Sequence, residues 1–292
     1  MNRVKCFIAA FLLSSAPVLF LSARPLSAQA RDPKLDALAE EVARGIEKHK
    51  PEGAAKKHLV TFLVFDFPEA TGGTTQLGIH LADDLSQALV LRSRKMKSVD
   101  RADLRALIEQ EHLDRAVFQQ DKVALWGAAT LGADLAVVGT IERASDAIHL
   151  KIRVIGHDPE KSFALDNGAV DWTDERHAWQ EQSVPQFPPA NPWKDVPNAN
   201  GKGYTPPTCI DCPQPPYSQE ARNARFSGTA TVLLLIGDDG SVREVRLVQG
   251  LPCDLNSQIV TALKEWRFQP PTGPDGKPAV VQLRAEINFH LL

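Results

Sequence analysis

The chain has 292 residues and a formal net charge of −3 at pH 7. This balance gives no basic footprint, so nucleic acid is not expected as a partner. With 43% hydrophobic residues, the chain is apolar enough to bury real cores, and its length suits two modest domains. The composition therefore predicts a soluble part built from two folded units and does not by itself indicate an activity.

The first thirty residues predict export. Arg3 and Lys5 precede a mostly apolar stretch over residues 7–21, and Ala28 and Ala30 fit the small-residue rule for signal peptidase. We therefore expect a cleaved signal peptide that ends at Ala30 and a periplasmic protein.

The alternative for this segment is an uncleaved inner-membrane anchor. The apolar stretch is shorter than the roughly 20 residues that a spanning helix needs, and it contains Pro17. Membrane association is thus expected only if the signal is retained.

Residues 31–183 predict a layered α/β domain. A continuous apolar run over residues 59–67 is typical of a strand buried on both faces, and leucines at every fourth position from Leu77 to Leu89 predict a helix. The alternation of strands and helices then favours a sheet that is parallel in part. The later elements, in chain order, are a strand at 98–99, a helix ending near 110, a helix at 123–131, and a hairpin of strands at 135–141 and 148–155.

A proline-rich stretch over residues 184–207 follows this domain. It contains seven prolines as well as Gly201 and Gly203. Such a composition predicts a semi-rigid, partly flexible linker that contributes few contacts.

Residues 208–292 predict a small αββαβ domain. The β-branched and aliphatic run at 229–236, a tight turn at Gly240 and the run at 242–248 form a hairpin. A short helix is expected near residues 217–224. The overall expectation is thus a two-domain protein of the α+β or α/β class.

The end of the chain completes this domain. Asp254 is expected to cap a helix whose apolar residues recur on one face as far as Trp266. The last strand, over residues 281–289, alternates apolar and polar side chains, as a strand with one wet face does.

Three cysteines follow the signal: Cys209, Cys212 and Cys253. In an exported chain a structural disulfide is the default. Cys209 with Cys212 is slightly preferred because the two lie close in the chain, and Cys212 with Cys253 comes next. Three thiols without a neighbouring histidine do not favour a metal site. If Cys253 stays free, its place at a helix start should lower its pKa and make it reactive.

Motifs for catalysis are missing from the sequence. It has no nucleophile elbow, zinc-protease, dinucleotide-binding or phosphate-loop pattern, so neither an enzyme nor a cofactor is expected. Gly72 and Gly73 indicate a plain turn. Asp66 and Asp83 resemble a carboxylate pair, but without a partner base they are expected to be solvated or to cap helices. The eight histidines are scattered and are expected to be surface or boundary residues.

The C-terminal domain resembles that of the TonB family, periplasmic proteins that touch outer-membrane receptors. The residues that carry this resemblance are Gln214 to Arg222, Phe226 to Gly228, Gly237 to Gly240, and Trp266 to Pro270. In that family the domain receives an extended peptide, which adds to the last strand by β-augmentation. The resemblance also implies buried core packing for Trp266 and Phe268.

By this resemblance the chain is a docking protein rather than a catalyst. Its partner would be a peptide segment of an envelope or outer-membrane protein, and the process would be outer-membrane transport. The partner-binding residues it implies are Gln214, Tyr217, Val281, Leu283, Arg284, Ala285, Glu286, Ile287 and Phe289.

The chain also departs from that family. An energy transducer keeps an N-terminal membrane helix and a long spacer, whereas here the apolar segment is expected to be cleaved and an α/β domain replaces the spacer. A membrane-anchored transducer therefore remains an alternative that requires the signal to be retained.

Residues 58–155 resemble the N-terminal domain of TolB-like and curli-secretion (CsgG or FlgO-like) envelope proteins. The likeness is carried by residues 64–67, 77–78, 81–83, 99–101, 131–134 and 138–139. A second alternative is thus a ligand-binding envelope protein that acts through this domain. A deep polar pocket near Asp66 and Asp83 would favour it.

Overall fold

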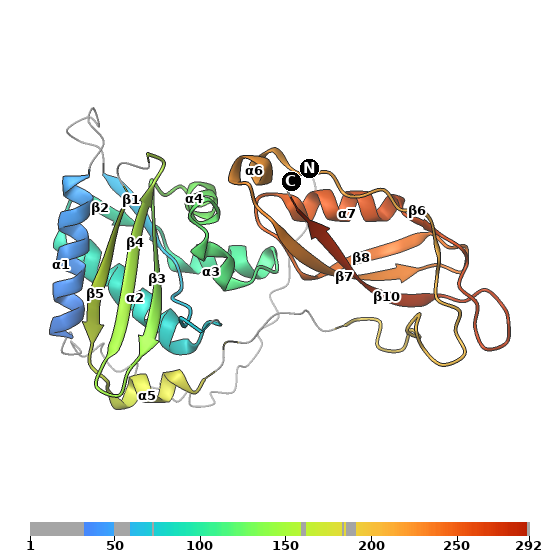
Figure 1. Cartoon of the computed structure of the whole chain (residues 1–292), viewed down its shortest axis with the longest axis horizontal. Helices are drawn as coiled ribbons and strands as arrows, with labels where there is room; N and C mark the ends of the chain where they lie inside the picture. The colour runs from blue at the N-terminus through green and yellow to red at the C-terminus, as the bar shows by residue number, and fades with distance from the viewer. Residues whose placement is uncertain are drawn as a thin grey trace, which may run out of the picture. The chain divides into compact units, whose positions relative to one another are not determined.

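The computed structural model describes residues 32–49, 59–71, 73–158, 162–182, 184 and 191–290. Residues 32–182 are called the N-terminal region below, and residues 191–290 the C-terminal region (Figure 1). The predicted signal peptide lies outside the described residues. Within the described ranges, no helix combines the length and the apolar character needed to cross a bilayer.

A five-stranded sheet forms the centre of the N-terminal region, in the order β2-β1-β3-β4-β5. Strands β2, β1 and β3 run parallel to one another, whereas β4 and β5 are added by antiparallel pairing. This confirms the predicted mixed sheet. The strands are β1 (Val60–Val64), β2 (Met96–Ser98), β3 (Leu135–Arg143), β4 (Ile148–Gly156) and β5 (Phe163–Val170).

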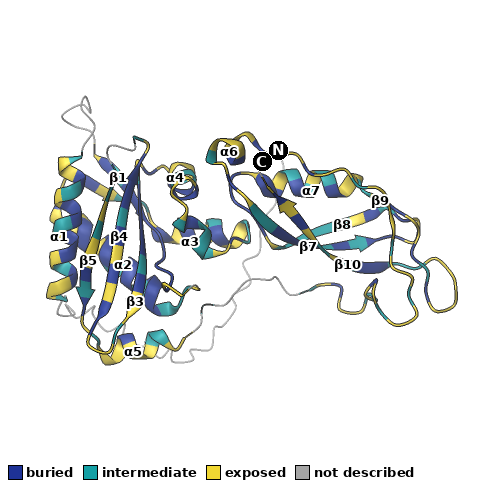
Figure 2. Cartoon of the chain, in the orientation of Figure 1, coloured by how far each residue is buried: buried dark blue, intermediate teal, exposed yellow. Residues whose placement is uncertain are grey.

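Helices cover both faces of this sheet. α1 and α2 bury their apolar residues with Phe62 and Val64 of β1, whereas α3 and α4 bury theirs with Leu63 from the same strand. Figure 2 shows the outer side of α1 exposed and its inner side buried. A strand covered on both faces needs a continuous apolar sequence, as seen at β1. The helices are α1 (Pro33–Lys48), α2 (Gln76–Arg92), α3 (Arg101–Gln110), α4 (Asp121–Thr130) and α5 (Asp174–Gln180), with a 3-10 turn η1 (Arg115–Gln119).

The C-terminal region contains a three-stranded antiparallel sheet in the order β10-β7-β8. Figure 1 shows α7 lying along this sheet, and Ile259 and Leu263 of α7 are fully buried in the same core as Val232 and Leu234 of β7. The order of elements confirms the expected αββαβ pattern, with one small pair of strands added. The elements are β6 (Cys209–Asp211), α6 (Gln219–Ala224), β7 (Gly228–Ile236), β8 (Val242–Gln249), α7 (Leu255–Glu265), β9 (Arg267–Phe268) and β10 (Val281–Phe289).

The turn between β7 and β8 depends on Gly240. Its φ is 80°, and a Cβ placed there would lie 2.0 Å from the Phe268 carbonyl oxygen. Any side chain would therefore be strained and would also collide with the backbone of β9. At α7, in contrast, the expected cap is wrong, because Asp254 has a φ of 58° and its side chain makes no capping hydrogen bond.

Residues 191–205 are attached to the C-terminal sheet. Trp193 and Ala199 are buried, and the Thr205 amide donates to the Thr272 carbonyl at 3.0 Å. The expectation that this proline-rich stretch contributes few contacts is therefore wrong for these residues. Prolines exclude long regular elements, but short turns can still bring buried side chains onto a sheet.

Candidate functional site

β10 lies at the edge of the C-terminal sheet. It pairs with β7 along its whole length, from Val281 opposite Ile236 to Phe289 opposite Gly228. Among the described residues no named strand pairs with its other side. The strand named by the sequence resemblance is thus an edge strand, the kind of element that can accept a further strand.

The alternation of an antiparallel ladder decides which backbone groups of β10 face outward. Residues along such a strand bond in turn to one side and to the other. The Gln282 amide and carbonyl bond away from β7, to Pro197 and Ala199 respectively, each at 2.8 Å. The same outward direction therefore applies to the backbone of Arg284, Glu286 and Asn288, which has no hydrogen-bond partner among the described residues.

The side chains of β10 divide between two faces. Val281, Ile287 and Phe289 are buried, and Leu283 and Ala285 are partly buried against the α7 core. The other face carries Arg284 and Glu286, which are exposed. The expected alternation is confirmed except at Gln282, which is only 8% exposed.

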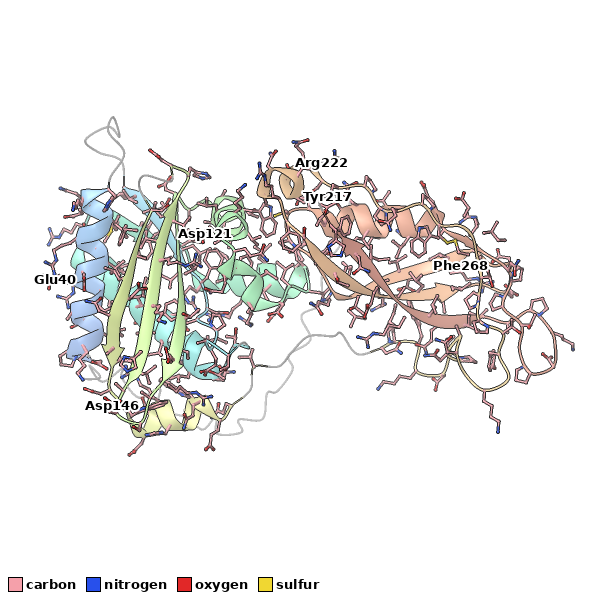
Figure 3. All side chains as sticks on the ribbon, viewed as in Figure 1. Glu40, Asp121, Asp146, Tyr217, Arg222 and Phe268 are labelled. Atoms are coloured by element: carbon pink, nitrogen blue, oxygen red, sulfur yellow. A yellow bond between two sulfur atoms is a disulfide. The ribbon has the colours of Figure 1, made fainter. Side chains whose placement is uncertain are left out.

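Tyr217, labelled in Figure 3, lies at the far end of β10. Its ring meets Phe289 edge-on with the centroids 5.0 Å apart, and its hydroxyl donates to the Phe226 carbonyl at 3.4 Å. Burial raises the pKa of Tyr217, although a hydrogen bond with Ser227 opposes the shift. The structure therefore brings Tyr217 to β10, whereas Gln214 is exposed and forms no hydrogen bond in the described part of the chain.

The other end of β10 is held by residues 191–199, which we call the clasp segment. The Gln282 side chain donates to the carbonyls of Trp193 and Val196, at 3.1 and 2.6 Å, and accepts from the Asn191 amide group at 2.7 Å. The Arg246 guanidinium lies 5.8 Å from the Trp193 ring centre. Sequence reasoning missed this contact, and the isolated tryptophan among prolines was the available signal.

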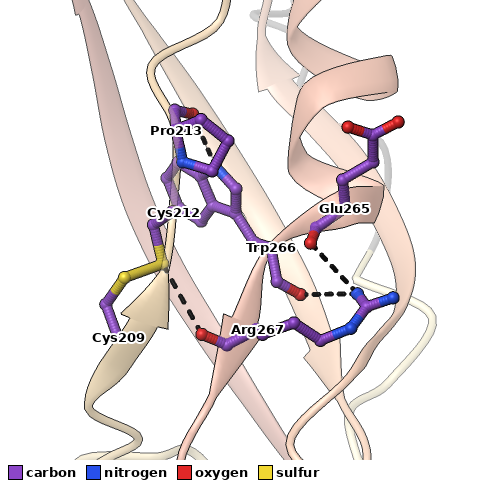
Figure 4. The surroundings of a disulfide bond; sticks show 6 residues. All are labelled: Cys209, Cys212, Pro213, Glu265, Trp266 and Arg267. Atoms are coloured by element: carbon purple, nitrogen blue, oxygen red, sulfur yellow. Dashed lines mark hydrogen bonds between the residues drawn. A yellow bond between two sulfur atoms is a disulfide. The ribbon is translucent and has the colours of Figure 1, made fainter.

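Cys209 and Cys212 form the disulfide (Figure 4), which is the preferred pair. It lies on β6, beside β9, where the Trp266 indole donates to the Pro213 carbonyl at 2.9 Å. Phe268 is buried as expected, but Trp266 is only partly buried, so its expected core role holds in part. This corner joins β6 to β9 and is not part of the β10 edge.

Cys253 is free and fully buried. Burial, with smaller contributions from the nearby acids Asp254 and Glu220, raises the pKa of its thiol to about 12. The expectation of a lowered pKa and a reactive thiol is therefore wrong. A helix start favours a thiolate only where water or a cation also stabilises the charge.

Asp66 and Asp83 do not cap helices, and both are paired with arginine. Arg101, itself buried, donates to Asp66 and to Asp83, each at 2.5 Å. Arg115 donates to the second oxygen of Asp66, and two further N–H groups of Arg101 donate to the carbonyls of Val64 and Ile79.

These carboxylates are thus neutralised inside the protein. The arrangement is an ion cluster in which Asp66 and Arg101 are buried and Asp83 is partly exposed, and it gives no support to a ligand site at Asp66 and Asp83. In the described ranges, no three His, Cys, Asp or Glu side chains are grouped so as to hold a metal.

Several histidines stack on aromatic rings rather than lying free on the surface. His80 stacks on Trp179 with the ring centres 4.0 Å apart, and His177 stacks on Trp172 at 4.5 Å. The first contact joins α2 to α5, and the second joins α5 to the segment that follows β5. They fulfil the expectation of boundary residues, with a packing role that the sequence did not reveal.

Comparison with known proteins identifies the class of the C-terminal region. Residues 213–291 match the family described as the Gram-negative bacterial TonB protein C-terminal. No curated protein matches the chain.

The solved structures similar to parts of this chain include a TonB C-terminal domain and LpoB. The TonB C-terminal domain of Pseudomonas aeruginosa is 22% identical, with a TM-score of 0.27, over 33% of this chain and 94% of that chain. LpoB of E. coli is 13% identical, with a TM-score of 0.36, over 57% of this chain and 83% of that chain. The LpoB C-terminal domain of Salmonella enterica is 16% identical, with a TM-score of 0.34, over 47% of this chain and 96% of that chain.

Proposed function

We propose that this chain is an exported envelope protein whose C-terminal region docks an extended peptide of another envelope or outer-membrane protein. The peptide adds to the outer edge of β10 by β-augmentation. The observation that carries the proposal is the row of outward backbone groups at Arg284, Glu286 and Asn288, which has no partner among the described residues. The family match of residues 213–291 supports the same region as the docking unit.

The edge of β10 can bind an added strand through its main chain and can also favour one orientation of that strand's side chains. Main-chain hydrogen bonds to the outward groups supply the pairing. The partly buried Leu283 and Ala285, together with Tyr217 near the end of the strand, give an apolar border on the α7 side. A partner peptide with apolar residues at alternate positions would cover this border, because alternate side chains of a strand share one face.

Proline and alanine substitutions at one position test main-chain pairing. Arg284→Pro removes a donor that points away from β7, so the sheet loses no internal hydrogen bond. We expect Arg284→Pro to abolish retention of envelope proteins on the immobilised chain and Arg284→Ala to leave most of it. The same contrast is expected at Glu286.

Two controls make this result interpretable. Circular dichroism and thermal melting must first show that the proline variant remains folded. Equal losses from alanine and proline would mean that the partner reads side chains, and full retention with proline would mean that it binds another surface. Either outcome contradicts the proposed mechanism.

We propose export because a charged start, an apolar stretch and the Ala28-x-Ala30 site follow one another in the order of a signal peptide. N-terminal sequencing of the protein from the periplasmic fraction should return Arg31 as the first residue. Recovery of Met1 from the membrane fraction would instead support the anchored alternative.

A further inference from the structure

The clasp segment sets the point at which the edge of β10 becomes free. One parallel bridge joins Asn198 to Gln282. The clasp then turns away, because the Asn198 side chain accepts from the Asn200 amide at 2.9 Å and its carbonyl accepts from the Gly201 amide at 2.7 Å. The position outside Gln282 is thus already occupied, and the open edge is the stretch 284–288.

The two charged side chains of the open edge have no partner within the protein. Arg284 lies opposite Leu233 of β7, and Glu286 lies opposite Thr231, so the neighbour on the inner side is uncharged in both cases. Neither side chain forms an ion pair with another described residue. Because they are two positions apart, both stand on the same face of the strand. An added strand would be the next element to meet them.

We infer that the docked peptide pairs over about five residues, from Arg284 to Asn288, and carries an acidic side chain opposite Arg284 and a basic side chain opposite Glu286. This inference rests on the proposed function and specifies the chemistry of its partner. Opposite charges that face each other across two strands stabilise the pair, and like charges destabilise it. The clasp segment prevents the peptide from extending its pairing to Gln282.

Four synthetic peptides test the charge rule with the full chain. They share one strand-forming sequence with blocked ends and differ at two alternate positions, which hold Glu with Lys, Glu with Glu, Lys with Lys, or Gln with Gln. Binding is followed by the NMR shifts of the β10 amides. The Glu and Lys peptide should bind about threefold more tightly than the Gln peptide, and each like-charged peptide more weakly than the Glu and Lys peptide. High salt should remove the difference.

Charge reversals in the chain should change the preference in a defined way. Arg284→Glu leaves two acids on the edge and should favour the Lys and Lys peptide, whereas Glu286→Arg should favour the Glu and Glu peptide. Lys264→Glu is the matched control, because Lys264 is exposed on α7 and away from the edge. It should keep the preference for Glu with Lys.

Gln282→Ala tests the boundary that the clasp segment sets. A peptide lengthened by two residues should gain affinity with this variant and not with the unchanged chain. An equal gain with both chains would overturn the boundary.

The outcomes separate this inference from the docking proposal. Equal binding of all four peptides, with shifts at β10 and loss in Arg284→Pro, would retain docking and overturn the charge rule. No binding, or shifts only outside β10, would overturn both.

Discussion

Arg101 in the N-terminal region is buried and donates to Asp66 and Asp83, whereas Arg284 on β10 is exposed and has no ion-pair partner among the described residues. In the first arrangement each nitrogen of the guanidinium donates a hydrogen bond within the fold. The second leaves an arginine and a glutamate open at the edge of a sheet. The contrast separates an arginine that is paired inside the fold from an arginine that we propose meets a partner. The same residue types therefore predict opposite experimental behaviour.

The largest effect is expected from Arg101→Met. Removing this arginine leaves Asp66 with Arg115 alone and Asp83 with the more distant Arg105 alone, and removing one partner of a buried ion pair typically costs about 3–5 kcal/mol. Urea unfolding followed by circular dichroism measures the change. Arg105→Met is the matched control, because the Arg105 side chain is only partly buried and lies 3.5 Å from Asp83. It should change the free energy of unfolding by less than about 0.5 kcal/mol. Similar losses for both variants would break the comparison.

The second effect concerns the closed part of the β10 edge. Gln282→Ala removes three side-chain hydrogen bonds to the clasp segment, and we expect it to lower the free energy of unfolding by about 2 kcal/mol. Trp193 should also become accessible to a fluorescence quencher. Gln269→Ala, at an exposed position, is the control and should do neither.

Truncation gives an independent measurement of the same contact. A chain that begins at Asn191 keeps the clasp segment, whereas a chain that begins at Thr208 loses it. We expect the longer form to melt cooperatively and at a higher temperature. Identical melting would mean that the clasp segment adds no stability.

The Cys253 thiol is a third kind of group, one that is buried but has no ionic partner, and its effect on stability should depend on pH. The pKa of the Cys253 thiol is raised to about 12 by burial, and an exposed thiol titrates near 8.5. Between these values the unfolded state binds fewer protons than the folded state, so stability is complete below about pH 8.5 and falls as the pH rises toward 12. The loss at about pH 10 should be roughly 1–2 kcal/mol.

Cys253→Ala isolates this contribution. Other titrating groups, including Tyr217, act equally in both chains, so the difference in unfolding free energy between the two chains should shrink as the pH rises. A constant difference would contradict the raised pKa. Alkylation adds a direct check, because a thiol with this pKa should react with iodoacetamide only after unfolding.

Much of this fold follows from local sequence patterns. α2 and β10 each carry a complete periodic signal within a few residues, and the apolar run of β3 marks a buried strand. The disulfide could be anticipated because Cys209 and Cys212 lie close in the chain.

The missed features depend on residues far apart in the sequence. Asp66 can be buried because Arg101, 35 residues later in the chain, donates a hydrogen bond to it. No local sequence pattern around Asp66 indicates this contact. The clasp segment is ordered by Gln282, at the other end of the C-terminal region. Cys253 was misjudged because a position at a helix start does not reveal burial. Local sequence thus predicts the helices and strands. Contacts between residues far apart in the chain decide whether a polar group is buried, paired or exposed.

The smallest effect is expected from removing the open charges. Arg284→Ala and Glu286→Ala should each change the free energy of unfolding by less than about 0.5 kcal/mol, since exposed charges without partners contribute little. Thermal or urea unfolding tests this. A loss as large as that of Arg101→Met would show that these side chains serve the fold and are not available to a partner.

The bridge between Asn198 and Gln282 also has a mechanical consequence. Asn198 lies at the start of the C-terminal region, and Gln282 lies in its last strand, so the chain is tied to β10 before it forms any other strand of that sheet. Tension applied along the preceding residues is therefore carried first by the Gln282 hydrogen bonds, before α7 or β7 is loaded. Force applied to the chain would therefore detach the clasp segment from β10, the same edge strand to which we propose that a peptide binds.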